Sequence, residues 1–93
     1  MTESEITFSS FVSSLAAGAL IAMGITPGLS EQAASPDLRL ARELIDTIEM
    51  LERKTAGNLD STETDLVRHI LTELRLHYVN QSEQAQQASS QEK

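Results

Sequence analysis

The sequence predicts an all-α protein: a small three-helix domain in which the second and third helices form an antiparallel helical hairpin. Apolar residues recur at three- and four-residue spacing in three separate segments. Helix-stop and helix-start residues lie between these segments, and the connection between the last two is short. We therefore place one helical domain at residues 1–80, followed by a polar tail at residues 81–93.

Length and composition limit the function classes. The chain has 93 residues, of which 40% are hydrophobic, so it forms one small domain. Fourteen acidic and seven basic residues give a net charge of −7, which disfavours nucleic acid and anionic lipid as partners. The chain has no cysteine, so it contains neither a disulfide nor a cysteine nucleophile. The first basic residue is Arg39, so we expect no cleaved secretory leader and a cytoplasmic protein.

The first helix is predicted at residues 7–23, and Gly24, Pro27 and Gly28 are expected to stop it. Its buried side is predicted to be an apolar stripe of seven residues, Phe8, Phe11, Val12, Leu15, Ala19, Ala22 and Met23. Ala17, Leu20 and Ile21 make its second half apolar on nearly all sides, and a helix of that kind needs cover on two sides.

A second line of small residues, each four apart, follows the first helix at Ser10, Ser14, Gly18 and Ala22. Such a line permits close approach of another helix, and it is equally compatible with a solvated serine face. The uncharged stretch at residues 6–30 also raises the possibility of membrane insertion. Its strongly apolar part, residues 15–25, is about half the length of a membrane span, and no Lys or Arg flanks it, so insertion is disfavoured.

The second helix is predicted at residues 36–56, after a short linker at residues 31–34. We expect Ser35 to cap it, with Pro36 in the first helical position. Its predicted buried stripe is Leu38, Ala41, Leu44, Ile45, Ile48 and Leu51, with Met50 outside. Asp46, Glu49 and Glu52 are interpreted as a solvated face that pairs with Arg42 and Arg53 rather than as acid-base groups.

The corner "ERKTAGNLDSTE" contains a lysine, a threonine and a glycine, but the Walker pattern of a phosphate loop is absent. We interpret it as the end of one helix followed by the start of the next. Gly57 or Asn58 supplies the left-handed residue, Asp60 and Glu63 form a capping box, and Leu59 packs under both helix ends.

The third helix is predicted at residues 61–79, with Val67, Ile70, Leu71, Leu74 and Tyr78 inward and Leu76 outward. The segment "QSEQAQQASSQEK" that follows has no apolar residue larger than alanine. Because it cannot recover the entropy lost on ordering, we expect a disordered tail.

Three stretches carry a family resemblance: "FSSFVSSLAAGALIAMGITP", "LARELIDTIEMLERKTAGNLDSTE" and "LRLHYVN". Together they cover residues 8–80, and Ile-Asp followed by Lys-Thr-x-Gly-Asn-Leu is distinctive. The chain resembles the bacterial family called domain of unknown function 1844. The resemblance implies a small helical cytoplasmic protein and supplies no catalytic residue.

Candidate chemistry is sparse. His69, Glu73 and His77 step by four along one helix face, so adjacent pairs could chelate a metal, but the two histidines are about 12 Å apart along the axis. We interpret them as exposed residues without a metal. Ser9, Ser10, Ser13 and Ser14 lack the G-x-S-x-G context of a nucleophile. We predict no cofactor and no enzymatic activity.

We therefore predict a non-catalytic protein-protein interaction module with an unknown protein partner, in which two copies of helix one cross near Gly18 to form a homodimer. The residues predicted for that contact are Ser10, Ser14, Gly18, Ile21 and Ala22. The alternatives are a membrane-associated protein that inserts helix one and a metal-binding protein that uses helix three.

Overall fold

The computed structural model describes residues 6–25 and 36–91, and it confirms the all-α prediction. Three helices follow one another along the chain: α1 (Phe8–Ala22), α2 (Leu38–Lys54) and α3 (Ser61–Gln91). The described residues contain no β-strand.

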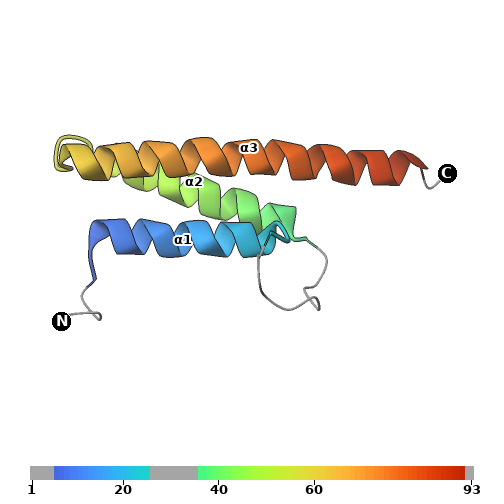
Figure 1. The fold of residues 1–93 in the computed structure, drawn as a ribbon, viewed down its shortest axis with the longest axis horizontal. Helices are drawn as coiled ribbons and strands as arrows, with labels where there is room; N and C mark the ends of the chain where they lie inside the picture. The colour runs from blue at the N-terminus through green and yellow to red at the C-terminus, as the bar shows by residue number, and fades with distance from the viewer. Residues whose placement is uncertain (1–5, 26–35, 92–93) are drawn as a thin grey trace.

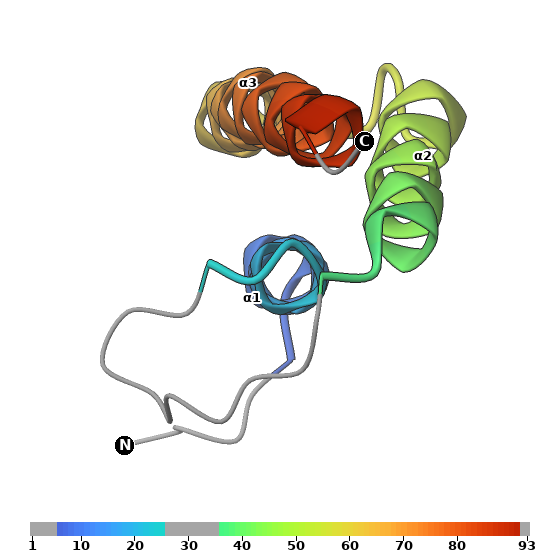
Figure 2. The same cartoon turned by 90° about the vertical axis from the view of Figure 1, so that its right-hand side faces the viewer.

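The three helices pack pairwise around a common core. A short corner joins α2 to α3, and the two helices run antiparallel, which confirms the predicted hairpin. α1 packs against both of them (Figure 1). The end-on view in Figure 2 places the helices at the corners of a triangle. Each helix therefore has two helical neighbours and one outer side.

Local hydrogen bonds set the ends of α1. The Thr7 hydroxyl accepts a hydrogen bond from the Ser10 N–H, and the Ser10 hydroxyl accepts one from the Thr7 N–H, both at 3.0 Å. This reciprocal capping box satisfies two N–H groups that lack helical partners. The helix ends before Gly24, whose φ of +85° favours glycine, as predicted. Pro27 and Gly28 lie outside the described residues.

The start of α2 corrects the prediction. The cap is Asp37, whose carboxylate accepts a hydrogen bond from the Leu40 N–H at 3.1 Å, and Pro36 precedes the helix. The Asp37 N–H donates to the Ala22 carbonyl at 2.7 Å, so this residue also ties the start of α2 to the end of α1. A carboxylate near the positive end of the helix dipole stabilises that end. Ser35, predicted as the cap, and the predicted linker at 31–34 lie outside the described residues.

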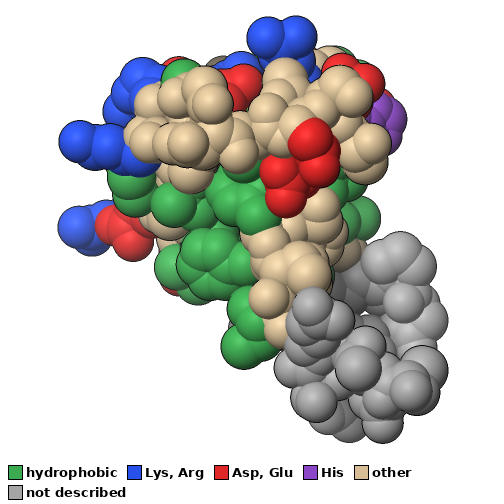
Figure 3. Space-filling model, turned by 90° about the vertical axis from the view of Figure 1, so that its left-hand side faces the viewer, with side chains coloured by type: hydrophobic (Ala, Val, Ile, Leu, Met, Phe, Trp, Pro, Cys, Tyr) green, Lys and Arg blue, Asp and Glu red, His purple; other side chains and the backbone are tan. Residues whose placement is uncertain are grey.

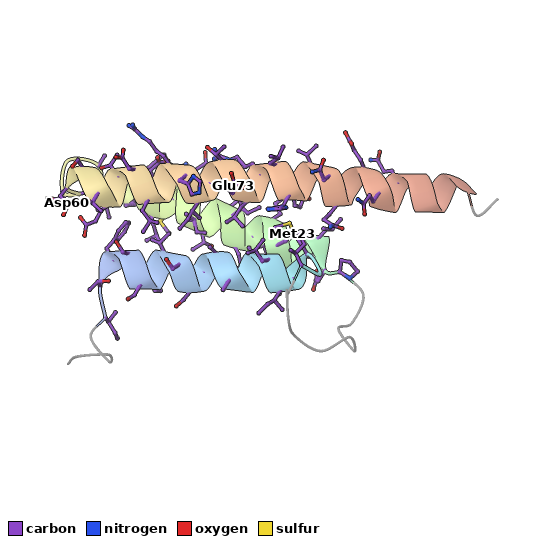
Figure 4. The ribbon with its side chains drawn as sticks, viewed as in Figure 1. Met23, Asp60 and Glu73 are labelled. Carbon is purple, nitrogen blue, oxygen red and sulfur yellow. The ribbon has the colours of Figure 1, made fainter. Side chains whose placement is uncertain are left out.

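The corner between α2 and α3 confirms the structural interpretation. Gly57 has a φ of +91° after Thr55 has capped α2. The Glu63 carboxylate accepts from the Asp60 N–H at 3.0 Å, and the Asp60 carboxylate accepts from the Glu63 N–H at 2.8 Å. Leu59, which lies in the corner between α2 and α3, packs against the core. Figure 4 shows Asp60 at this corner.

The third helix is longer than predicted. α3 continues to Gln91, through most of the segment expected to be disordered, and projects beyond the other two helices (Figure 1). No Gly or Pro follows Asn80, and the segment is rich in Gln and Ala, which form helices readily. A helix that is already nucleated can extend through such residues without burying apolar surface.

Among the residues that the structure describes, ten hydrophobic side chains are buried in the core, and the three predicted stripes supply all of them. Met23 at the end of α1 lies among the helices in Figure 4 and is fully buried. Leu76 and Met50 point outward, as predicted. Phe11, predicted to be buried, is 47% exposed. The buried set is Val12, Ala19, Ala22, Met23, Ala41, Ile45, Ile48, Val67, Leu71 and Leu74.

Candidate interaction surface

The five residues predicted for a helix-helix contact do not lie on one free surface. Ala22 is buried in the core of its own chain. A Cβ atom built on Gly18 would lie 3.4 Å from Leu44 Cδ1, so α2 already occupies the close approach that this glycine permits. Ser10 and Ser14 are exposed, and Ile21 is 56% exposed. The structure therefore leaves Ser10, Ser14 and Ile21 accessible and places Gly18 and Ala22 against the rest of the chain.

A different set of residues forms an apolar surface where α1 meets α2. On α1, Phe11, Ser14, Gly18 and Ile21 recur at spacings of three and four, so they share one side of the helix. The contact between Gly18 and Leu44 joins that side to a matching row on α2. We call the joined rows the α1–α2 face, formed by Phe11, Ser14, Gly18 and Ile21 with Leu40, Leu44, Thr47 and Leu51.

Large apolar side chains are accessible at both ends of the α1–α2 face. Phe11 is 47% exposed at one end. At the other end, Ile21 is 56% exposed and Leu40 is 44% exposed. Figure 3, in which α1 lies below α3, shows hydrophobic side chains gathered in the lower part of the molecule and basic side chains along its upper and left edges.

The hydroxyl groups in the α1–α2 face are already satisfied by the backbone. The Ser14 hydroxyl donates to the Ser10 carbonyl at 3.0 Å, and the Thr47 hydroxyl donates to the Glu43 carbonyl at 2.7 Å. A hydroxyl that keeps its hydrogen bond when it leaves water avoids most of the cost of desolvation. The α1–α2 face therefore behaves as an apolar surface despite its serine and threonine.

The ion pairs of the described residues lie on the outer sides of α2 and α3. Three ion pairs join residues one turn apart on α2, between Arg39 and Glu43, Arg42 and Asp46, and Arg53 and Glu49. Two of them are the pairings predicted for Arg42 and Arg53. Glu49 also lies 3.3 Å from Arg75 of α3 and so links the two helices of the hairpin. These groups are solvent-exposed, so each pair adds little stability.

The residues considered for a metal line a groove between α1 and α3. His69, Glu73 and His77 lie on α3, and Ala16 and Leu20 of α1 form part of the opposite side, around about 270 Å³ of space. Figure 4 shows Glu73 on the surface of α3. Among residues 6–25 and 36–91, no three His, Cys, Asp or Glu side chains are placed to hold a metal ion together.

Two further recesses lie on the surface. A recess of about 220 Å³ lies at the corner between α2 and α3, with Glu52 and Arg68 among its lining residues. A recess of about 280 Å³ lies where α3 passes the start of α2, between Leu38 and Gln81. Sequence reasoning proposed neither, because both depend on how the helices pack.

The comparison with protein families agrees with the helical architecture. The family model described as a domain of unknown function, DUF1844, matches residues 5–80. The chain belongs to this family. No curated protein and no solved structure matches the chain.

The DUF1844 match spans α1, α2, the corner and α3 as far as Asn80. All eight residues of the α1–α2 face lie within it, whereas the projecting end of α3 lies outside. The surface described above is therefore part of the DUF1844 domain. No helix in the described part of the chain combines the length and the apolar character needed to cross a bilayer.

Proposed function

We propose that this acidic DUF1844 protein is a non-catalytic helical interaction module that self-associates through α1 and presents the charged outer sides of α2 and α3 to a protein partner. The observation that carries the proposal is the absence of charged residues from α1. Residues 6–30 contain no charged residue in a chain whose net charge is −7. Ile21 on this helix is nevertheless 56% exposed.

Electrostatics favours a second copy as the cover for α1. Two chains of charge −7 repel each other, and the repulsion is stronger where the acidic sides of α3 meet. Contact through an uncharged helix keeps those sides apart and removes apolar surface from water. α3 has four acidic and two basic residues, so a partner on its outer side is expected to offer lysine or arginine residues, since complementary charge speeds and selects association.

The burial pattern supports the non-catalytic part of the proposal. Within the described residues, no polar or charged side chain is buried. General acids and bases are commonly tuned by burial or by a close charged neighbour. The exposed acidic residues of α2 and α3 lack the first of these, and their ion pairs are solvated.

Sedimentation equilibrium of the full chain over a wide concentration range tests self-association. We expect a monomer-dimer equilibrium in dilute buffer. A single-chain mass at every concentration would overturn the proposal. Affinity purification at low and high salt tests the second part, because a partner held by charge on the outer sides of α2 and α3 should be released as salt rises.

A further inference from the structure

The predicted crossing of two α1 helices at Gly18 needs revision. Close crossings depend on residues without bulky side chains, and here the approach at Gly18 is taken by Leu44 of the same chain. Ala22, the next residue in that line, is in the core. The apolar surface that stays accessible is the α1–α2 face, which includes one side of α2 as well as α1.

We propose that a second copy of this chain docks on the α1–α2 face in an isologous, two-fold symmetric dimer. The inference rests on the proposed self-association and names the surface that performs it. In an isologous contact, residue i of one copy meets residue j of the other and the reverse contact is made as well. The two ends of the face must therefore be complementary to each other.

The apolar ends of the face satisfy this condition. α1 and α2 run in opposite directions, and the bond from the Asp37 N–H to the Ala22 carbonyl places the start of α2 beside the end of α1. Ile21 and Leu40 thus share one end, and Phe11 lies at the other. A two-fold rotation brings Phe11 of one copy onto Ile21 and Leu40 of the second.

The charges on the rim of the face satisfy the same condition. Glu43, Met50 and Lys54 form the rim of the face on α2 together with Thr47, which belongs to the face itself, and the four recur at spacings of four, three and four. A two-fold axis midway along this row brings Glu43 of one copy to Lys54 of the second, and Thr47 to Met50. Lys54 has no salt bridge within the described residues, and Met50 is 37% exposed.

Two substitutions of equal chemistry test the apolar contact. Ile21→Glu places a carboxylate inside the proposed interface, and Leu76→Glu places one at a residue of similar exposure, 57%, on the outer side of α3. We expect Ile21→Glu to weaken the dimer at least about tenfold, because each buried carboxylate lacks a partner, and Leu76→Glu to leave it unchanged. Circular dichroism confirms that both variants keep their helices.

Charge reversal on the rim tests the symmetry and does not disturb the core. Glu43→Lys and Lys54→Glu each place like charges together at two symmetric positions. We expect Lys54→Glu, which also makes each copy more negative, to weaken the dimer by a factor of about 2 to 25, as the loss of two exposed pairs would. Glu43→Lys makes each copy less negative, so the weaker overall repulsion offsets part of the loss of its pairs and we expect a smaller effect. The double variant Glu43→Lys/Lys54→Glu restores the opposite charges and should recover the original dissociation constant.

The outcomes separate the inference from the proposed function. A native chain that stays monomeric overturns both. A native dimer that tolerates Ile21→Glu, or one in which the double reversal is weaker than Lys54→Glu alone, overturns the docking surface and leaves self-association standing. Dissociation by Ile21→Glu together with rescue by the double reversal supports the isologous dimer.

Discussion

Leu74 and Leu76 are chemically identical and two residues apart in α3, but only 2% of Leu74 is exposed against 57% of Leu76. Truncating a buried leucine removes transfer free energy and leaves a cavity. We expect Leu74→Ala to lower the free energy of unfolding by about 2 to 5 kcal/mol and Leu76→Ala to change it by less than about 0.5 kcal/mol. Urea denaturation at one fixed protein concentration measures both, and equal costs would mean that the orientation of α3 is wrong.

Asp60 and Glu63 stabilise the start of α3 by exchanging hydrogen bonds with each other's backbone N–H groups at 2.8 and 3.0 Å. Asp60→Ala removes the acceptor for the Glu63 N–H, so we expect a loss of about 0.5 to 2 kcal/mol of stability. The control is Asp65→Ala, which removes an exposed carboxylate from the same helix. The midpoint of thermal unfolding, followed by circular dichroism, should be clearly lower for Asp60→Ala than for Asp65→Ala. The reverse order would contradict the capping role of Asp60.

At the scale of the helices, apolar periodicity correctly predicted the three helices and the side of each that faces the core. A stripe at three- and four-residue spacing marks one side of a helix, and that side is buried when the helix packs. The starting point of α2 was harder to predict. Ser35, Pro36 and Asp37 all favour a helix start, and the bond from Asp37 to the Ala22 carbonyl, a contact between distant residues, accompanies the start at Leu38. Phe11 was wrongly predicted to be buried for a similar reason, because its exposure depends on where the distant helix α2 packs.

The end of α3 shows a competition between two physical terms. The absence of apolar residues predicted disorder after Asn80, whereas the helix propensity of Gln and Ala and the lack of a stop residue favour continuation. The structure follows the second, and the first turn of the extension lines a recess that Leu38 of α2 also lines.

Proline at Gln84 decides whether the extension is helical in solution. Gln84→Pro removes a backbone donor and breaks a helix interior. We expect it to reduce the ellipticity at 222 nm while the midpoint of thermal unfolding changes little, because the ten buried core residues all precede this position. Gln84→Ala should leave the ellipticity unchanged or raise it slightly. Identical spectra for the native chain and Gln84→Pro would favour the disordered tail.

At the scale of the whole molecule, the candidate surface was only half accessible to sequence reasoning. The line of small residues four apart identified Ser14 and Gly18, and the apolar second half of the helix identified Ile21, because both patterns are visible along one helix. The part of the α1–α2 face that lies on α2, which includes Leu40, was not predicted. The sequence of α2 taken alone shows only a buried stripe and a charged side. That a single surface spans both helices follows only from the contact between Gly18 and Leu44.

Charge distribution over the whole molecule also gives the proposed dimer a salt dependence with a defined sign. Two copies together carry −14, twice the −7 of one chain, so long-range repulsion opposes association. The reciprocal pairs of Glu43 with Lys54 favour it, but exposed pairs contribute little. Raising sodium chloride from about 0.1 M to 1 M shortens the screening length from about 10 Å to 3 Å.

Salt weakens both the repulsion between the two copies and the attraction of the Glu43–Lys54 pairs. The larger of the two therefore decides whether the dissociation constant rises or falls. We expect the repulsion to dominate, so the dissociation constant measured by sedimentation equilibrium should fall as salt rises. In Glu43→Lys/Lys54→Glu the net charge is unchanged, so the same salt dependence is expected. A dissociation constant that rises with salt would show that ion pairs hold the copies together, and would move the contact from the uncharged α1–α2 face to the charged sides of α2 and α3.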